Sequence, residues 1–297
     1  MIVVAYLALC IIWGTTYLVI KVALGGFPPF VLGAIRFAIA GAVFLPILLM
    51  HRDRLPKTKE QWGWLALTGT LMLAGGNGLV NFGEQYIDSG LTALTVSTTP
   101  AWSALFGRMI IGDSEKLDKV SLLGIVLAMG GIAVLHHNRM SFELNEWPGL
   151  VALLLCPPVW TIAAIWTRKH LRGLDTITVS ATQMLAGAVS FALISALFGE
   201  SWDINPSTDA VLAMLYLAVM GSVVAFTAYA YLLARVPAAR VNTYSLVNPV
   251  IALFAGAIIL KEPITPEVIP ATILILAGLV ILYIMRNRGA VSAAKNR

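Results

Sequence analysis

Apolar stretches of about 20 residues follow one another along almost the whole chain, and they constrain its fold more than any other feature. A helix needs that many apolar residues to cross the hydrocarbon core of a bilayer. The chain is 59% hydrophobic and 12% charged, whereas soluble domains carry about 25% charged residues. The sequence therefore predicts an all-α integral membrane protein with ten transmembrane helices, at residues 2–23, 29–50, 61–83, 91–111, 120–136, 148–167, 175–198, 210–233, 241–260 and 267–285.

Basic residues are concentrated in every second connection between these spans. Sixteen Lys and Arg residues lie in 51–60, 108–119, 168–172, 235–240 and the tail 286–297, whereas the other connections hold two, beside nine acidic residues. This asymmetry predicts an orientation with both termini in the cytoplasm. The first apolar run lacks a basic region before it, so it is interpreted as a span and not as a signal peptide. The net charge of +5 follows from this topology and indicates no nucleic-acid partner.

Landmarks of the first half of the chain recur in the second half at a nearly constant offset. The matched positions are Trp13 with Trp160, Lys21 with Arg168, Arg36 with Gln183 and Gly131 with Gly278 at an offset of 147, and Pro100 with Pro249 at 149. The sequence therefore predicts two copies, residues 1–136 and 148–285, followed by the basic tail. Five helices per copy is an odd number, so the two copies are predicted to be inverted repeats in the membrane.

Two of the predicted spans, the fourth and the ninth, contain the matched prolines Pro100 and Pro249. Proline lacks an N–H group and displaces the carbonyl four residues before it. In hydrocarbon such a break is tolerated only where protein or a water-filled cavity faces it. Each proline lies roughly 12 to 14 Å into its span at 1.5 Å per residue, close to half of the core thickness, about 15 Å. The sequence predicts two helix breaks that flank a binding site near the bilayer midplane.

Three charged side chains are predicted within or at the rim of the spans: Lys21, Arg36 and Glu84. Such charges are costly in a membrane and are usually paired or face a cavity. Helical spacing places Asn77 and Asn81 on the face of Glu84, and Trp13 and Tyr17 on the face of Lys21.

One hypothesis is that Arg36 or Lys21 receives a substrate carboxylate while Glu84 acts as a counter-ion or proton carrier. The alternative is a structural ion pair that holds the first three helices together, with Lys21 extending to the surface.

Aromatic and small polar side chains in the same and the matching helices complete a predicted pocket for an amphipathic small molecule. Trp62, Trp64, Trp147 and Trp202 lie near span ends and are interpreted as interfacial residues. The further predicted substrate-binding residues are Thr98, Thr99, Trp102, Trp160, Tyr229, Asn242, Tyr244, Ser245 and Asn248.

Motifs of enzymes and nucleotide-binding proteins are not found in the sequence, which contains no GxxxxGK[ST], HExxH or GxSxG. The chain is therefore predicted not to be an enzyme, to have no catalytic residues and to use no cofactor. The adjacent His136 and His137 lack further ligands nearby, so no metal site is predicted. Cys10 and Cys156 are interpreted as packing residues.

The sequence resembles the drug/metabolite transporter superfamily, in its ten-helix EamA-type branch. The resemblance rests on IIWGTTYLVIKVAL, GNGLVNFGEQYIDSGLTALTVSTTP and AARVNTYSLVNPVIALFAGAIILKE, which together span both halves. It implies two EamA repeats, a central cavity lined by helices one, three, four, six, eight and nine, and alternating access, often for export of amino acids or related compounds. The second half departs from the first, with Gln183 in place of Arg36, and Phe226 and Ala230 in place of Asn77 and Asn81.

The functional hypothesis is a secondary transporter of the bacterial inner membrane that exports amino acids or similar small amphipathic metabolites by alternating access, with any proton coupling through Glu84. Its partners would be a small-molecule substrate and the lipid bilayer. The alternatives are a flippase or scramblase for lipids or lipid-linked substrates, a facilitative channel-like carrier, and a membrane scaffold without transport.

Overall fold

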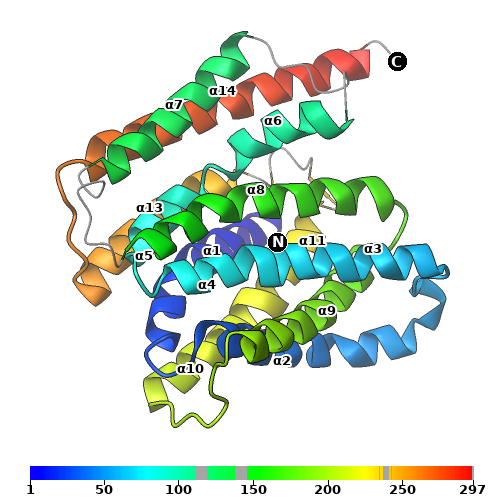
Figure 1. Ribbon diagram of the computed structural model, residues 1–297. Helices are drawn as coiled ribbons and strands as arrows, with labels where there is room; N and C mark the ends of the chain where they lie inside the picture. Colours follow the sequence, from blue (N-terminus) through cyan, green and yellow to red (C-terminus); the bar gives the residue numbers. More distant parts are fainter. Residues whose placement is uncertain (112–118, 138–145, 234, 237–240, 242, 296–297) are drawn as a thin grey trace.

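The structure is a computed structural model that describes residues 1–111, 119–137, 146–233, 235–236, 241 and 243–295 (Figure 1). These residues form helices and connections without a β-strand, so the predicted all-α class is confirmed. The elements are α1 (Ile2–Ala23), α2 (Pro29–Met50), η1 (Arg52–Arg54), α3 (Lys59–Gly69), η2 (Thr70–Asn77), α4 (Gly78–Gly83), α5 (Ser89–Val96), α6 (Thr99–Ile111), α7 (Lys119–His136), α8 (Trp147–His170), α9 (Thr176–Leu197), α10 (Thr208–Tyr216), η4 (Leu217–Val224), α11 (Ala225–Leu233), α13 (Tyr244–Ala255), η5 (Gly256–Leu260) and α14 (Val268–Lys295).

Seven helices within the described ranges are long and apolar enough to cross a membrane. A shorter apolar helix covers Tyr244–Leu260, and the predicted fourth span is divided into α5 and α6. The count of ten spans and the inverted repeats stay predictions. The chain is an integral membrane protein by its helices, and its hydrophobic outer surface suits lipid and not water.

The predicted third and eighth spans each contain a π-helical segment of eight residues, η2 and η4. These segments begin at Thr70 and Leu217, which are 147 residues apart, the same offset as the sequence landmarks. A π turn widens the helix by one residue per turn and is found most often at functional sites. Hydropathy alone does not distinguish such a turn from an α-helix, so the sequence did not predict these segments.

Helices that occupy matching places in the two halves pack against each other. α2 contacts α9 extensively, and α7 contacts α14, beside which it runs in Figure 1. At Gly278 in α14, an added Cβ would lie 2.5 Å from the carbonyl oxygen of Gly124 in α7. Only glycine therefore permits these two backbones to approach so closely.

The break at Pro100 lies at Ser97 and Thr98, between α5 and α6. Because Pro100 has no N–H group, the carbonyl of Val96 loses its helical partner. The hydroxyl of Thr99 donates to that carbonyl at 2.6 Å. The freed carbonyl is therefore bound by its own segment, whereas the sequence prediction had it facing a binding site.

The helix around Pro249 differs from the prediction, because α13 runs without interruption from Tyr244 to Ala255. Pro249 lies in the second turn of this helix, where its missing N–H group removes one hydrogen bond near the helix start and does not end the helix. The irregular part of this span is instead η5, which follows α13 and ends at Lys261, in a left-handed conformation with φ of 59°.

Candidate substrate site at the π-helical segment of the second half

Arg36 of α2 is 4% exposed and points its guanidinium group at the π-helical segment η4. Its Nε donates to the hydroxyl of Ser222 at 3.0 Å. The guanidinium carbon lies 4.8 Å from the ring centroid of Phe37. Its Nη1 is buried and has no hydrogen-bond partner among the described residues. A buried guanidinium nitrogen without an acceptor is costly, so this group is suited to receive an anionic ligand.

α1 reaches the same turn of η4 through Trp13, whose Nε1 donates to the carbonyl of Gly221 at 3.0 Å. An added Cβ at Gly221 would lie 3.2 Å from Thr16 and 3.4 Å from Nη2 of Arg36. Because Gly221 has no side chain, it leaves enough space for α1, α2 and η4 to meet at this point. This point joins the first half of the chain to the second.

Three aromatic rings pack around Trp13. Ring centroids lie 5.4 Å away for Phe226, 5.5 Å for Tyr229 and 4.8 Å for Tyr244. Tyr229 and Tyr244 are predicted site residues, and Phe226 is an aromatic neighbour that the sequence comparison noted only as a departure from Asn77. Together Arg36 and these rings, which we call the Arg36 site, provide a cation beside an aromatic surface.

Gln183 of α9, the sequence counterpart of Arg36, has a different environment. Its amide nitrogen donates to the hydroxyls of Thr68 at 2.9 Å and Thr167 at 3.0 Å. Both amide protons are therefore used within the protein. The two halves place a polar side chain at equivalent positions, but only Arg36 retains an unused donor.

Lys21 and Glu84 lie together at the end of the third span, as their helical positions suggested. Nζ of Lys21 donates to the carbonyl of Glu84 at 2.7 Å and to that of Ile87 at 3.0 Å. The Glu84 side chain is 0% exposed, and neither carboxylate oxygen has a hydrogen-bond partner among the described residues. Its electrostatic neighbours are Lys21 and Glu262. Lys21 thus binds backbone carbonyls at a helix end, where a cation is favoured, and its side chain is half-buried.

Several other predicted site residues bind the protein itself. Asn81 donates to the carbonyl of Pro29 at 3.0 Å, which joins α4 to the start of α2. With its amide oriented to donate, Asn248 bonds the carbonyls of Cys10 at 3.2 Å and Tyr244 at 3.0 Å. Thr98 donates to the carbonyl of Thr95 at 2.7 Å, as Thr99 does to Val96. These side chains hold helices in place.

The remaining predicted residues are spread over different places. Trp160 packs its ring over Gly76 in η2, and Trp102 packs on Phe106 at 5.5 Å. Tyr17 and Asn77 are half-buried, Ser245 is the second residue of α13, and Asn242 lies outside the described residues. No group of three or more His, Cys, Asp or Glu side chains suited to a metal is found in the described part of the chain.

Two carboxylates that the sequence did not single out bind across the halves. Glu200, between α9 and α10, accepts from the backbone N–H groups of Phe30 at 3.1 Å and Val31 at 2.9 Å. They are the first N–H groups of α2, which begins with two prolines and has no capping side chain of its own. A carboxylate at a helix N-terminus satisfies orphan donors and the helix dipole.

Glu262, after η5, binds the start of α5 in the same way. It accepts from the N–H of Ser89 at 2.9 Å, the hydroxyl of Ser89 at 3.0 Å and the N–H of Gly90 at 3.2 Å. The N-cap residue of α5, Asp88, makes no capping bond with its side chain. A helix start that lacks a capping side chain in its own segment indicates that a distant residue caps it. The sequence does not indicate which acidic residue that is.

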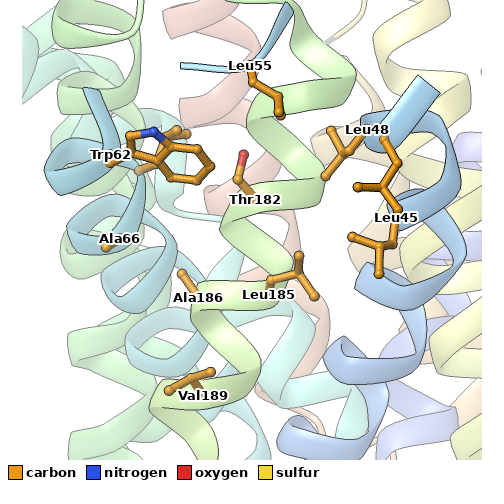
Figure 2. Close-up of a pocket in the computed structure, with 11 residues that line it drawn as sticks. Leu45, Leu48, Leu55, Trp62, Ala66, Thr182, Leu185, Ala186 and Val189 are labelled. Carbon is orange, nitrogen blue, oxygen red and sulfur yellow. The ribbon is translucent and has the colours of Figure 1, made fainter. Parts of the chain in front are cut away.

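A pocket of about 390 Å³ lies away from all the predicted site residues, between α2, α3 and α9 (Figure 2). Figure 2 shows leucines of α2, Trp62 and Ala66 of α3, and one side of α9 around it. Its lining residues are Leu45, Leu48, Leu49, Leu55, Trp62, Leu65, Ala66, Thr182, Leu185, Ala186 and Val189. We call it the α2–α9 groove.

These features describe a multi-pass helical membrane protein with a buried cation and half-buried aromatic rings between its halves. Residues 1–136 and 147–284 match the EamA-like transporter family, and the chain belongs to that family. The resemblance found in the sequence is therefore confirmed.

Named relatives cover most of the chain. It is 34% identical to "Uncharacterized inner membrane transporter YedA" of Escherichia coli K12, across 85% of this chain and 80% of the relative. It is 26% identical to "Probable amino-acid metabolite efflux pump" of Salmonella typhimurium, across 93% and 92% of the two chains. One solved crystal structure has a TM-score of 0.68 over 96% of this chain and 97% of the other, at 22% identity, which shows a shared fold.

Proposed function

We propose that the protein is a secondary transporter that exports amino acids or similar small amphipathic metabolites across the bacterial inner membrane by alternating access. The family is one of transporters, and a relative that matches nearly its whole length is named an amino-acid metabolite efflux pump. The observation that carries the proposal is the Arg36 site, a buried cation with a free donor between the two halves.

The chemistry of the Arg36 site favours a substrate that has a carboxylate and an apolar part. A guanidinium group binds carboxylates through charge-assisted hydrogen bonds. The rings of Trp13, Tyr229 and Tyr244 offer an apolar surface within the same site. An amino acid would place its carboxylate at Nη1 of Arg36 and its side chain against these rings. The site is built from both halves, as a binding site for alternating access requires.

Motion of the two halves would expose this site to each side of the membrane in turn. Glu200 and Glu262, both in the second half, bind helix starts of the first half. The connections that carry them lie at the left of Figure 1, between α9 and α10 and between η5 and α14. We call this the carboxylate-capped end, and the charge asymmetry of the sequence assigns it to the periplasm. The hydrogen bonds of Glu200 and Glu262 would keep the Arg36 site closed to the periplasm.

The repeat offers a matching set of contacts for the opposite arrangement. An offset of 147 relates Glu200 to Asp53, and Phe30 and Val31 to Ile177 and Thr178 at the start of α9. Asp53 is exposed, and Thr178 is capped by Asp175 of its own segment at 3.1 Å. In the opposite arrangement Asp53 would bind the start of α9 while Glu200 releases that of α2.

Proton coupling would run through Glu84. A buried carboxylate without a hydrogen-bond partner is more stable when it is protonated. Its electrostatic neighbour Glu262 belongs to the carboxylate-capped end. A charge on Glu84 would repel Glu262 and weaken its hold on α5, so the protonation of Glu84 and the closure of this end would be linked.

Flux measurements in proteoliposomes test the proposal, with a panel of radiolabelled amino acids and a pH gradient. Arg36→Gln is expected to lower flux at least 10-fold, because removing a charged hydrogen bond to a ligand costs about 1.5 to 3 kcal/mol, while Arg235→Gln, at an exposed arginine, leaves it unchanged. Glu84→Gln should leave flux independent of the pH gradient. Normal flux in Arg36→Gln would disprove the substrate role, and scrambling of labelled lipid by the wild-type protein would favour a scramblase.

A further inference from the structure

The α2–α9 groove opens sideways from the helices, toward the place that lipid occupies around a membrane protein. The large apolar side chains on its rim are partly exposed, including Leu49 at 52%, Trp62 at 44% and Val189 at 61%. Thr182 contributes the single hydroxyl of its lining. The groove is apolar, and its lining residues run along α9 from Thr182 to Val189 (Figure 2), so it suits a hydrocarbon chain.

One end of the groove lies beneath a basic connection of the chain. Leu55, from the connection between α2 and α3, lines that end, and both Leu55 and Ile177 at the start of α9 pack against the same apolar cluster. The same connection holds Arg52, Arg54, Lys57 and Lys59, all exposed. The nearby connection between α8 and α9 adds exposed basic residues, among them Lys169 and Arg172. Residues 51–60 and 168–175 together contain seven basic and three acidic residues. We call this region the basic end.

We infer that the α2–α9 groove and the basic end form a binding site for one anionic glycerophospholipid, with an acyl chain in the groove and the phosphate among Arg52 and Arg54. Basic clusters directly beside membrane helices recognise anionic headgroups. Trp62 lies at the first turn of α3, where an indole ring suits the boundary between headgroup and chain. The apolar lining then receives the chain that is attached to the headgroup.

A second copy of the protein is a less suitable occupant of the groove. In a bilayer, apolar surfaces gain little by leaving lipid for protein, so helix pairs need small residues or polar contacts at their interface. The rim offers large leucines and Trp62 instead. A copy docked symmetrically here would also bring a second basic end close to the first, and like charges repel.

The lipid would contact both halves of the transporter at once. α2 and α3 belong to the first half, whereas α9 belongs to the second. A chain between them would fill the space on this side and stabilise the arrangement that the structure shows. Anionic lipid would then bias the equilibrium on which the proposed alternating access depends, although lipid binding itself does not require that the protein transports anything.

Native mass spectrometry and thermal unfolding of the purified protein in detergent test the inference with three probes: dioleoyl phosphatidylglycerol, dioleoyl phosphatidylcholine and glycerol phosphate. Phosphatidylglycerol should bind with one molecule per chain and raise the unfolding midpoint more than the other two. The double variant Arg52→Gln/Arg54→Gln should weaken binding about 25-fold, because each basic residue near an anionic lipid contributes about a factor of five. Lys261→Gln, an exposed lysine at the other end, serves as its control.

A second pair of variants tests the groove itself. Ala66→Trp places a large ring in the groove from an exposed alanine and should abolish the phosphatidylglycerol effect, whereas Leu67→Trp, next to it and outside the lining, should not. Equal stabilisation by both phospholipids, or an unchanged effect in Ala66→Trp, would overturn the inference. If glycerol phosphate raises the unfolding midpoint as much as phosphatidylglycerol does, the site binds an anion and not a lipid. If the protein forms a dimer without lipid and Ala66→Trp abolishes that dimer, the groove binds a second copy of the protein.

Discussion

The two ends of the helical bundle hold their helix starts in different ways. At the carboxylate-capped end, α2 and α5 begin without a working cap of their own, and Glu200 and Glu262 cap them from the other half. At the basic end, α3 begins with a capping box between Thr58 and Gln61, and α9 begins with the cap of Asp175. Both of the latter caps lie within the segment that they stabilise.

This difference determines the free energy that is needed to separate the two halves at each end. Opening the carboxylate-capped end leaves the first N–H groups of two helices unpaired and releases two charged side chains. Opening the basic end leaves the caps of α3 and α9 intact. The bundle can therefore favour closure at one end through a few hydrogen bonds, and exchanging those bonds is a low-cost way to reverse the preference.

The largest effect is expected when both distant caps are weakened together in Glu200→Gln/Glu262→Gln. Loss of the charge should shift the equilibrium toward opening of the carboxylate-capped end about 100-fold, if each cap contributes about 1.5 kcal/mol. A cysteine at Ala23, which is fully buried at the end of α1, reports this opening in a background with Cys10→Ala and Cys156→Ala. Its rate of modification by a membrane-impermeant maleimide should rise.

The control for this measurement is Glu60→Gln, which removes an exposed carboxylate at the basic end. Modification of Ala23→Cys should be unchanged in that variant. If the double variant also leaves the modification rate unchanged, the two carboxylates do not hold the end closed, whatever the protein transports.

A smaller effect is expected from Asp53→Asn at the basic end. Asp53 is exposed in this arrangement, so its substitution should leave the thermal stability the same. If Asp53 caps α9 in the opposite arrangement, flux should fall about 10-fold, which corresponds to the loss of about 1.4 kcal/mol in that state. Proteoliposome flux and unfolding midpoints measure the two quantities, and unchanged flux would contradict the exchange of caps.

Much of the fold could be predicted from the sequence because the bilayer allows few solutions. Apolar length gave the helices, and the burial of Arg36 in α2 follows from its position within a span. The interruption before Pro100 follows from a missing N–H group. Such properties depend on neighbours in the chain or on the membrane, both of which the sequence displays.

Features that depend on distant contacts could not be predicted in this way. The cap of α2 by Glu200 joins residues 170 positions apart. The hydrogen bond from Trp13 to η4 requires both a π turn and the close approach of α1 at Gly221. Hydropathy carries no information on either. The continuous helix through Pro249 likewise depends on where α13 begins, which shifts the proline into an early turn.

The smallest effect is expected at the local cap of α9. Asp175→Ala removes the acceptor for the N–H of Thr178 and should lower the free energy of unfolding by about 1 kcal/mol, without exposing Ala23→Cys at the other end. Its effect on flux distinguishes two roles for this residue. If the cap only stabilises α9, flux is unchanged in Asp175→Ala. If Asp175 instead competes with Asp53 for the same N–H group, removing it favours the opposite arrangement and raises flux. Adding Asp53→Asn to Asp175→Ala should then reverse the rise in flux. A cap that is local in one state and distant in the other would thus explain how two similar halves alternate with few changes of contact.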